Sequence, residues 1–126
     1  MTHSPTAIVI FGITGDLARR MLIPALYHLY RNKLLPEGTL ILGITRRHST
    51  SAEVLRGLRY GVGENAADAK TWRAFAGRIR VLTADIENPT GYAALALLLK
   101  RFFGRAAHCR HILYYLAVPP ASYANI

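Results

Sequence analysis

Residues Ile8–Ala18 read IVIFGITGDLA, and this stretch decides the fold of the chain. The apolar and mostly branched run Ala7–Phe11 is typical of a strand buried on both faces, because helices that cover a parallel sheet leave neither face in water. The chain then turns at Gly12, and a long amphipathic run begins at Asp16. The stretch therefore predicts a strand, a glycine turn and a helix in succession.

The glycine turn is a candidate phosphate site. Gly12, Gly15 and Ala18 recur at every third position. Unpaired N–H groups and the partial positive charge at a helix N-terminus hold anions, and glycine lets the backbone approach them closely. The usual dinucleotide motif G-x-G-x-x-G would place its first glycine at Ile10, so this chain offers G-x-x-G-x-x-A instead. A tight strand-to-helix connection without a ligand is the alternative, but the strand before the turn and the helix after it favour a nucleotide site.

Two arginines follow the second predicted strand. This strand, LILGIT, spans Leu40–Thr45 and is followed directly by Arg46 and Arg47. An NAD site carries an acidic side chain here for the ribose 2′-hydroxyl, whereas a 2′-phosphate requires cationic, fork-shaped donors. We therefore expect NADP as the cofactor, with an ordinary basic turn as the alternative. Arg46 lies further from Gly15 than the roughly 20 residues of the common pattern, and a longer first helix accounts for the difference.

Helices are expected between and beside the strands. They span Asp16–Lys33, Ser49–Leu58 and Ala66–Phe75, and a fourth begins near Pro89. Pro24 removes a donor and crowds the preceding turn, so we expect a kink or a local break in the first helix. Ser49, Thr50 or Ser51 is expected to cap the second helix, and GVGEN at residues Gly61–Asn65 to form a loop.

The alternation of strands and helices predicts an α/β fold. The four expected strands are Ala7–Phe11, Leu40–Thr45, Ile79–Asp85 and His111–Val118. Right-handed crossovers then give a Rossmann-like parallel sheet in the order 3-2-1-4, which is half of a doubly wound fold plus one strand across the switch point. A nucleotide binds at the carboxyl ends of such strands, so we expect Gly12, Arg46, Asp85 and Ala117 to converge there.

Length and composition indicate one globular domain over residues 1–126. The hydrophobic content of 52% is too high for a disordered chain. No apolar run reaches the roughly 18 residues that span a bilayer, and the first residues lack a signal-peptide pattern, so we expect a cytoplasmic protein with no membrane partner. Cys109 is the single cysteine, which excludes an internal disulfide and a cysteine-based zinc site, and we expect no metal.

The formal net charge of +9 raises the possibility of a nucleic-acid partner. The sixteen Lys and Arg residues are spread along the chain without a dense stripe or a repeated basic-aromatic motif. We therefore expect most of them on solvated helix faces and no nucleic-acid partner.

Four segments together carry a family resemblance. FGITGDLARR, LIPALY, LGITRR and YYLAVPP resemble, in order and spacing, the N-terminal coenzyme domain of glucose-6-phosphate dehydrogenase. The resemblance covers the chain from Ala7 to Ile126. It implies an NADP-dependent oxidoreductase of the pentose phosphate pathway that passes a hydride from C1 of glucose 6-phosphate to NADP and yields phosphogluconolactone. For full-length members it also implies a homo-oligomer.

The resemblance also assigns cofactor-binding positions. These are Gly12, Ile13, Thr14, Gly15, Asp16 and Leu17 at the pyrophosphate, Arg46 and Arg47 at the 2′-phosphate, Asp85 and Ile86 beside the adenine, and Leu116, Ala117 and Pro119 along the nicotinamide ribose. Family members usually carry lysine, near the substrate, where this chain has Met21. The family's catalytic histidine and substrate-phosphate residues match positions beyond 126, and none of the five histidines of this chain falls in the matching motif.

We therefore assign no catalytic residue and expect a truncated form of the family. It should bind NADP without turning over glucose 6-phosphate, because the substrate domain would be absent and the sheet incomplete. Its fourth strand would be an exposed edge, which favours self-association. A non-catalytic NADP-sensing module is the alternative function.

Overall fold

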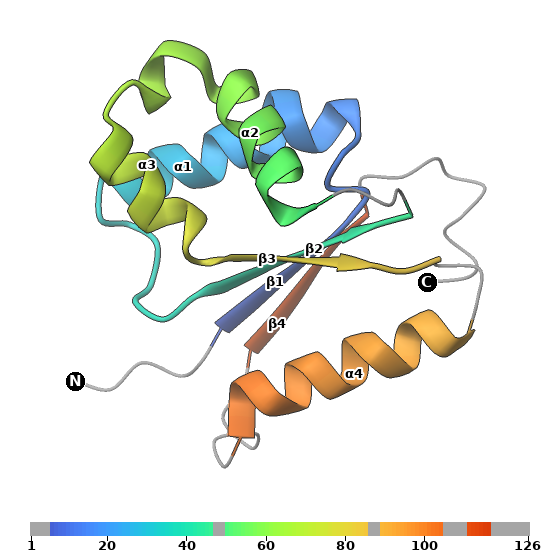
Figure 1. Cartoon of the computed structure of the whole chain (residues 1–126). Helices are drawn as coiled ribbons and strands as arrows, with labels where there is room; N and C mark the ends of the chain where they lie inside the picture. The colour runs from blue at the N-terminus through green and yellow to red at the C-terminus, as the bar shows by residue number, and fades with distance from the viewer. Residues whose placement is uncertain (1–5, 47–49, 86–88, 105–110, 117–126) are drawn as a thin grey trace.

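The fold is a parallel sheet with helices on both faces. The computed structural model describes residues 6–46, 50–85, 89–104 and 111–116. Within these ranges the strands are β1 (Thr6–Phe11), β2 (Leu40–Thr45), β3 (Ile79–Thr83) and β4 (His111–Leu116). All pairings are parallel and the strand order is β3-β2-β1-β4, which confirms the predicted topology (Figure 1).

The two central strands carry the longest buried runs. Every residue of β2 is buried, and in β1 only Thr6 is partly exposed. Ile8 and Ile10 pack into one hydrophobic cluster, whereas Val9 and Phe11 pack into a second cluster. Successive side chains of a strand point to opposite faces of the sheet, so this alternation places one cluster on each face.

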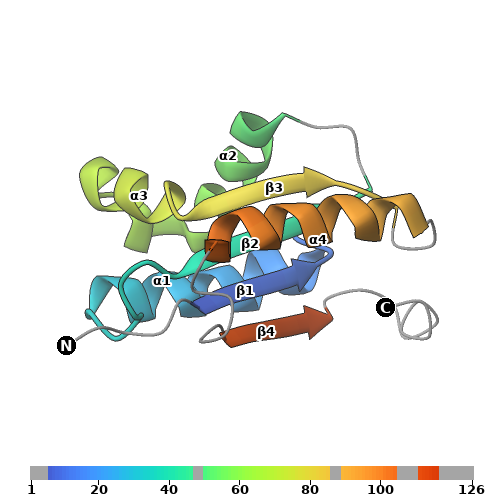
Figure 2. The same ribbon diagram turned by 90° about the horizontal axis from the view of Figure 1, so that it is seen from below.

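In the described part of the chain, three helices cover one face of the sheet and one helix covers the other. The first group consists of α1 (Ile23–Arg31), α2 (Ser51–Val62) and α3 (Ala69–Ala76), and α4 (Pro89–Phe103) lies on the opposite face (Figures 1 and 2). The three helices pack into the cluster of Ile8 and Ile10 through Tyr27, Leu58 and Phe75. Helix α4 packs into the cluster of Val9 and Phe11 through Leu95 and Leu99. The second face is therefore covered more sparsely than the first.

The first helical segment begins at Asp16, as predicted, and contains a π-helical turn at Ala18–Leu22 ahead of α1. The Ile23 N–H donates to the Ala18 carbonyl, five residues back. Pro24 has no N–H to donate, and its ring would crowd the carbonyl of Arg20 in a regular α-helix. The widened turn relieves this conflict, so the expected local break takes the form of a π-helix.

The segment after α2 corrects two predictions. GVGEN is not a loop: Gly61 and Val62 complete α2, and a 3-10 turn follows at Gly63–Ala66. Val62 is buried four residues after the buried Leu58, so the apolar stripe of α2 continues into this stretch. The next helix begins at Ala69 rather than at Ala66, because the Asp68 side chain caps it.

The predicted cap of α2 is confirmed as Thr50, whose Oγ1 accepts from the Glu53 N–H at 3.1 Å. Among the predicted strands, β3 ends at Thr83, two residues short of Asp85. The described part of β4 ends at Leu116, and residues 117–118 of that prediction lie outside the described residues. None of these differences changes the order of the sheet.

Candidate functional site

The glycine turn after β1 is attached to the neighbouring strand. Gly12 has a φ of +88°, a left-handed conformation that glycine adopts without steric cost. The N–H groups of Gly12 and Ile13 both donate to the Ile44 carbonyl of β2, at 2.9 and 3.2 Å. These two groups are therefore engaged inside the protein, and the two residues shape the turn rather than offer their N–H groups to an anion.

The helix start supplies the N–H groups that a phosphate needs. The Gly15 N–H closes the turn by donating to the Gly12 carbonyl at 2.9 Å, and the Arg19 N–H donates to the Gly15 carbonyl at 3.1 Å. The N–H groups of residues 16–18 lie ahead of this first helical hydrogen bond. Because the first N–H groups of a helix have no intrahelical acceptor, they form a positively polarised end directed away from the helix.

The side chains of the turn divide between core and surface. Ile13 is fully buried and belongs to the cluster beneath α1, α2 and α3. The Oγ1 atoms of Thr14 and Thr45 lie 3.2 Å apart, which joins the turn to the end of β2 by a hydrogen bond. Leu17 is 44% exposed on the first helical turn. Of the predicted turn residues, Ile13 is thus structural, whereas Thr14 and Leu17 remain accessible.

Charged groups surround the helix start. The Asp16 carboxylate accepts from Arg19 at 3.1 Å and from Arg20 at 3.4 Å, and all three side chains are exposed. Such exposed pairs contribute little to stability. Glu53 of α2 also lies beside the turn, so two carboxylates balance the two arginines there, and the attraction for a phosphate comes from the polarised helix start.

The other predicted site residues that the structure describes lie at the same edge of the sheet. We call this the carboxyl edge, because β1 to β4 all end there. Arg46 follows β2 directly and is exposed. The Ala84 N–H donates to the Thr45 carbonyl at 2.8 Å, which brings Asp85 beside the end of β2. Leu116 is in register with Phe11 at the end of β1. Arg47, Ile86, Ala117 and Pro119 lie outside the described residues.

A cavity of about 150 Å³ lies between the turn and α2. Ile13 and Thr14 line it from the turn, and Glu53 and Gly57 line it from α2. The sequence prediction did not include these two α2 residues among the site residues. No local sequence motif identifies Glu53 and Gly57 as site residues, because they reach the cavity only through the packing of α2 against the turn.

A second, smaller cavity of about 10 Å³ lies at the end of β3, lined in part by Asp85, Gly91 and Tyr92. Burial, followed by the negative charge of Asp85, raises the pKa of the Tyr92 phenol, which therefore stays neutral. A Cβ on Gly91 would lie 2.9 Å from the Asp85 carbonyl oxygen. Gly91 thus lets the start of α4 approach the carboxyl edge, a role that sequence reasoning also missed.

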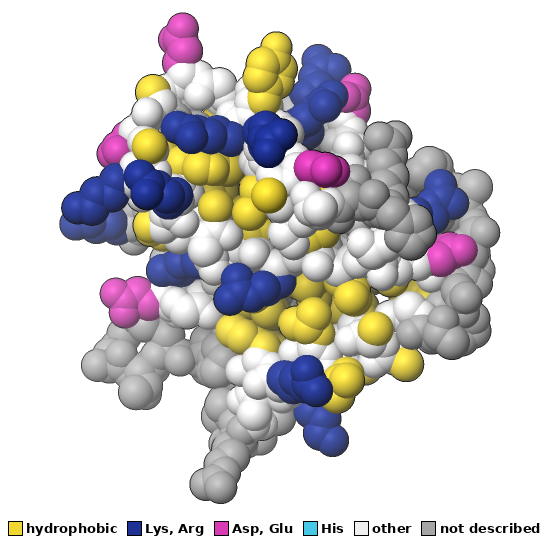
Figure 3. Space-filling view, in the orientation of Figure 1, with side chains coloured by type: hydrophobic (Ala, Val, Ile, Leu, Met, Phe, Trp, Pro, Cys, Tyr) yellow, Lys and Arg dark blue, Asp and Glu magenta, His cyan; other side chains and the backbone are white. Residues whose placement is uncertain are grey.

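The described residues contain neither a candidate metal cluster nor a membrane-spanning helix. No group of three or more His, Cys, Asp or Glu side chains within residues 6–46, 50–85, 89–104 and 111–116 could hold a metal ion. In the same ranges, no helix is both long enough and apolar enough to cross a membrane. On the face shown in Figure 3, Lys and Arg side chains are interspersed with apolar and acidic ones instead of forming one stripe.

The chain matches one family over almost its whole length. Residues 9–126 match the family described as "Glucose-6-phosphate dehydrogenase, NAD binding domain". Among curated proteins, glucose-6-phosphate 1-dehydrogenase 1 of Mycobacterium tuberculosis is 38% identical over 94% of this chain. The glucose-6-phosphate 1-dehydrogenase of Chlamydia pneumoniae is 30% identical over 99% of it. These matches cover 24% and 25% of the two relatives, so the chain spans about a quarter of their length.

Solved structures agree with this match. A glucose-6-phosphate dehydrogenase determined in complex with its substrate glucose 6-phosphate superimposes with a TM-score of 0.85 at 26% identity, covering 99% of this chain and 27% of that one. Glucose-6-phosphate 1-dehydrogenase of Mycobacterium avium gives a TM-score of 0.81 at 32% identity, covering 97% of this chain and 25% of that one. The chain therefore belongs to the family of glucose-6-phosphate dehydrogenase NAD binding domains.

Proposed function

We propose that residues 1–126 form one NADP-binding domain and supply the coenzyme part of a glucose-6-phosphate dehydrogenase. The observation that carries this proposal is the meeting of a glycine turn and an exposed arginine at one sheet edge. Gly12 bonds to the Ile44 carbonyl, and Arg46 lies two residues beyond Ile44. A dinucleotide with a 2′-phosphate has a pyrophosphate that can bind at the glycine turn and a 2′-phosphate that can bind at the arginine.

The residues at the carboxyl edge fit such a cofactor. The helix start at residues 16–18 offers backbone donors to a pyrophosphate, and Thr14 offers a hydroxyl beside them. Arg46 presents a planar guanidinium to the 2′-phosphate, which it can bind through two hydrogen bonds. Asp85 lies beside the end of β2 and Leu116 is in register with Phe11 of β1. We assign Asp85 to the adenine end of the cofactor and Leu116 to the nicotinamide end. We propose that these residues bind the cofactor and that none of them is catalytic.

In the proposed reaction, C1 of glucose 6-phosphate loses a hydride and its hydroxyl loses a proton, which gives 6-phosphogluconolactone. Bound NADP would supply the hydride acceptor. The proton requires a base positioned at that hydroxyl. Neither described histidine is at the carboxyl edge: His28 is in the last turn of α1, and His111 begins β4. We propose that this chain binds NADP without turnover, and neither of these two described histidines is a candidate for that base.

The test is calorimetric titration of the 126-residue chain with NADP and with NAD. NADP should bind more tightly, and Arg46→Gln should reduce its affinity about ten- to hundred-fold while leaving NAD unchanged, because a charge-assisted hydrogen bond contributes roughly 1.5–3 kcal/mol. Arg73→Gln is the matched control, since Arg73 is an exposed arginine on α3. Equal effects of the two substitutions would contradict the proposal. NADPH formation from glucose 6-phosphate by the isolated chain would contradict binding without turnover.

A further inference from the structure

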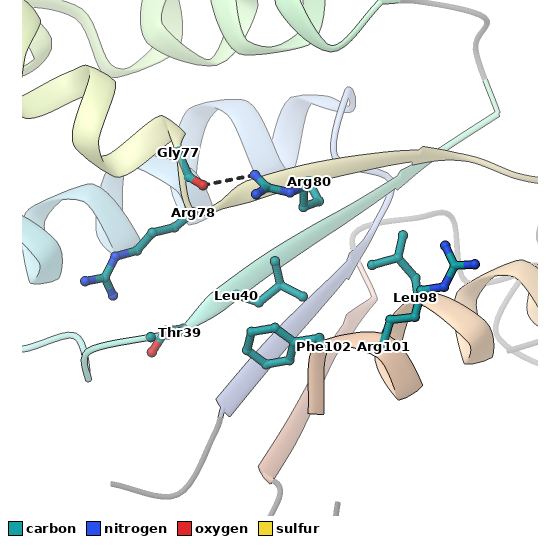
Figure 4. Close-up of a pocket in the computed structure, with 9 residues that line it drawn as sticks. Thr39, Leu40, Gly77, Arg78, Arg80, Leu98, Arg101 and Phe102 are labelled. Atoms are coloured by element: carbon teal, nitrogen blue, oxygen red, sulfur yellow. Dashed lines mark hydrogen bonds between the residues drawn. The ribbon is translucent and has the colours of Figure 1, made fainter. Parts of the chain in front are cut away.

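A larger cavity lies at the opposite edge of the sheet from the glycine turn. Its volume is about 430 Å³, within the range of small-molecule sites. It opens where β2 and β3 begin, between these strands and the C-terminal half of α4 (Figure 4). Leu40 starts β2 and Thr45 ends it, so five strand steps of ~3.3 Å place the cavity about 16 Å from the carboxyl edge. A ligand here would leave the proposed coenzyme site open.

Apolar side chains form the floor of this cavity. Leu40 lies at its centre, with Leu98 and Phe102 of α4 beside it (Figure 4). Phe102 and Leu98 are only partly buried, because α4 is the one helix among the described residues that covers this face of the sheet. The exposed part of the Phe102 ring offers a flat surface on which an aromatic group can stack.

Three arginines line the cavity, and among the described residues no carboxylate lines it. Arg78 is held in place, since its Nη1 donates to the Pro36 carbonyl at 2.9 Å and its guanidinium lies 5.1 Å from the centroid of the Tyr30 ring. Arg80 donates through Nη1 to the Gly77 carbonyl at 3.0 Å, as the dashed line in Figure 4 shows. Each of these guanidinium groups keeps further N–H donors, because the group has five.

The third arginine, Arg101, is exposed in the last turn of α4. Within the described part of the chain its guanidinium takes part in no hydrogen bond or ion pair. The Arg78 guanidinium points away from Leu40 and Phe102 toward Tyr30, which leaves Arg80 and Arg101 as the two separate positive charges at the cavity (Figure 4). A ligand that uses the whole cavity therefore has a flat apolar body and more than one negative charge at its periphery.

We propose that this cavity binds a nucleoside polyphosphate as a second, separate site. The base covers Leu40 and stacks on Phe102, and the phosphates pair with Arg80 and Arg101 in the charge-assisted geometry that guanidinium groups favour. A ligand of another class would use only one part of the site. A neutral apolar molecule leaves the arginines unused, and inorganic phosphate leaves the apolar floor in water.

The test is titration of the 126-residue chain with ATP in the presence of saturating NADP, followed by calorimetry and by amide NMR shifts. ATP should shift the amides of Gly38, Thr39 and Gly77. Arg101→Gln and Arg80→Gln should each weaken ATP binding at least tenfold, and Arg46→Gln should not. Arg101→Gln is the decisive variant, because Arg101 forms no polar contact that the fold requires, and thermal melts verify that each variant is folded.

Pyrophosphate and a Glu- and Leu-rich helical peptide are the comparison ligands. Pyrophosphate should bind at least tenfold more weakly than ATP, and equal affinity would overturn the role of the base. A peptide that shifts the same amides at lower concentration than ATP would overturn the proposal in favour of a protein partner. ATP binding that Arg46→Gln abolishes and Arg101→Gln leaves unchanged would also overturn it. That last result would leave the proposed coenzyme site intact, so the two proposals fail separately.

Discussion

Ile13 fills the space that a side chain at Gly43 would occupy. A Cβ atom built on Gly43 would lie 2.8 Å from both Cβ and Cγ2 of Ile13 and closer still to its Cδ1. Gly43 is in the middle of β2, and Ile13 is in the turn that follows β1. The absence of a side chain on β2 therefore lets the glycine turn fold down onto the sheet.

Gly43→Ala should destabilise the chain by about 1–3 kcal/mol, because overpacking a filled core costs that much. It should also weaken NADP binding, since the turn must move. Urea unfolding and calorimetry measure the two effects. Ile13→Ala removes Cγ1, Cγ2 and Cδ1 but keeps Cβ, so it relieves part of the overlap, and the double variant should be more stable than the sum of the two single effects predicts. A Gly43→Ala variant as stable as the wild type would show that the contact is not restrictive.

Two glycines of α2 form a matched pair. A Cβ on Gly61 would lie 2.6 Å from the Arg19 carbonyl oxygen in the π-helical turn, whereas a Cβ on Gly57 meets nothing within 4 Å. Gly61→Ala should therefore destabilise the fold by about 1–3 kcal/mol. Gly57→Ala should stabilise it by about 0.5–1 kcal/mol, through helix propensity. Urea unfolding of both variants tests the pair, and a change of the same sign at both positions would contradict the close approach of α2.

The cap of α3 predicts a stability change at acid pH. The hydroxyl of Thr71 donates to Asp68 at 2.6 Å, and this bond, with the Lys70 N–H, lowers the pKa of Asp68 below its ordinary value of 3.8. A carboxyl with a lower pKa in the folded state stabilises the fold above the unfolded-state pKa. That contribution should be lost as the pH falls from about 3.8 through the folded-state value.

Asp68→Asn removes the titrating group. The stability difference between the wild type and this variant, measured by urea unfolding across the acid range, should be constant well above pH 3.8 and shrink below it. A difference that stays the same through the acid range would mean that the Asp68 charge does not support the cap.

The outer edge of β4 should promote self-association. Within the described residues β4 pairs only with β1, and Leu113 and Tyr114 are 58% and 51% exposed on it. Unpaired edge strands recruit other chains, and a lysine on the edge suppresses this. Sedimentation velocity should show concentration-dependent association that Leu113→Lys reduces. Leu97→Lys is the control, because Leu97 is 51% exposed on α4. Equal reduction by both variants, or a monomer at all concentrations, would contradict the prediction.

The sequence predicted the sheet well because its signals are local. Branched apolar runs end at glycine, proline or charged residues, so β2 was predicted at its observed bounds and β1 to within one residue. Pro24 predicted a break in the first helix because proline has no N–H to donate and crowds the preceding turn, and the π-helical turn lies directly before it. GVGEN was misread as a loop, because its two glycines outweighed the apolar spacing that Val62 continues.

The sequence predicted which sheet edge the candidate site residues share, but not how they pack there. The glycine spacing and the predicted strand ends were sufficient to predict that the turn, Arg46 and Asp85 lie at one edge of the sheet. The contacts that fix this geometry join residues far apart in the chain. Gly43 beneath Ile13 is one such contact, and Gly91 against Asp85 is another. No local pattern distinguishes such glycines from those of ordinary turns, so only the folded chain reveals them.

A crystal structure of the chain with NADP tests the central claim most directly. We predict pyrophosphate oxygens within hydrogen-bond distance of the N–H groups of residues 16–18 and the 2′-phosphate against the Arg46 guanidinium. Density for the dinucleotide at another surface, or none at a saturating concentration, would contradict the account.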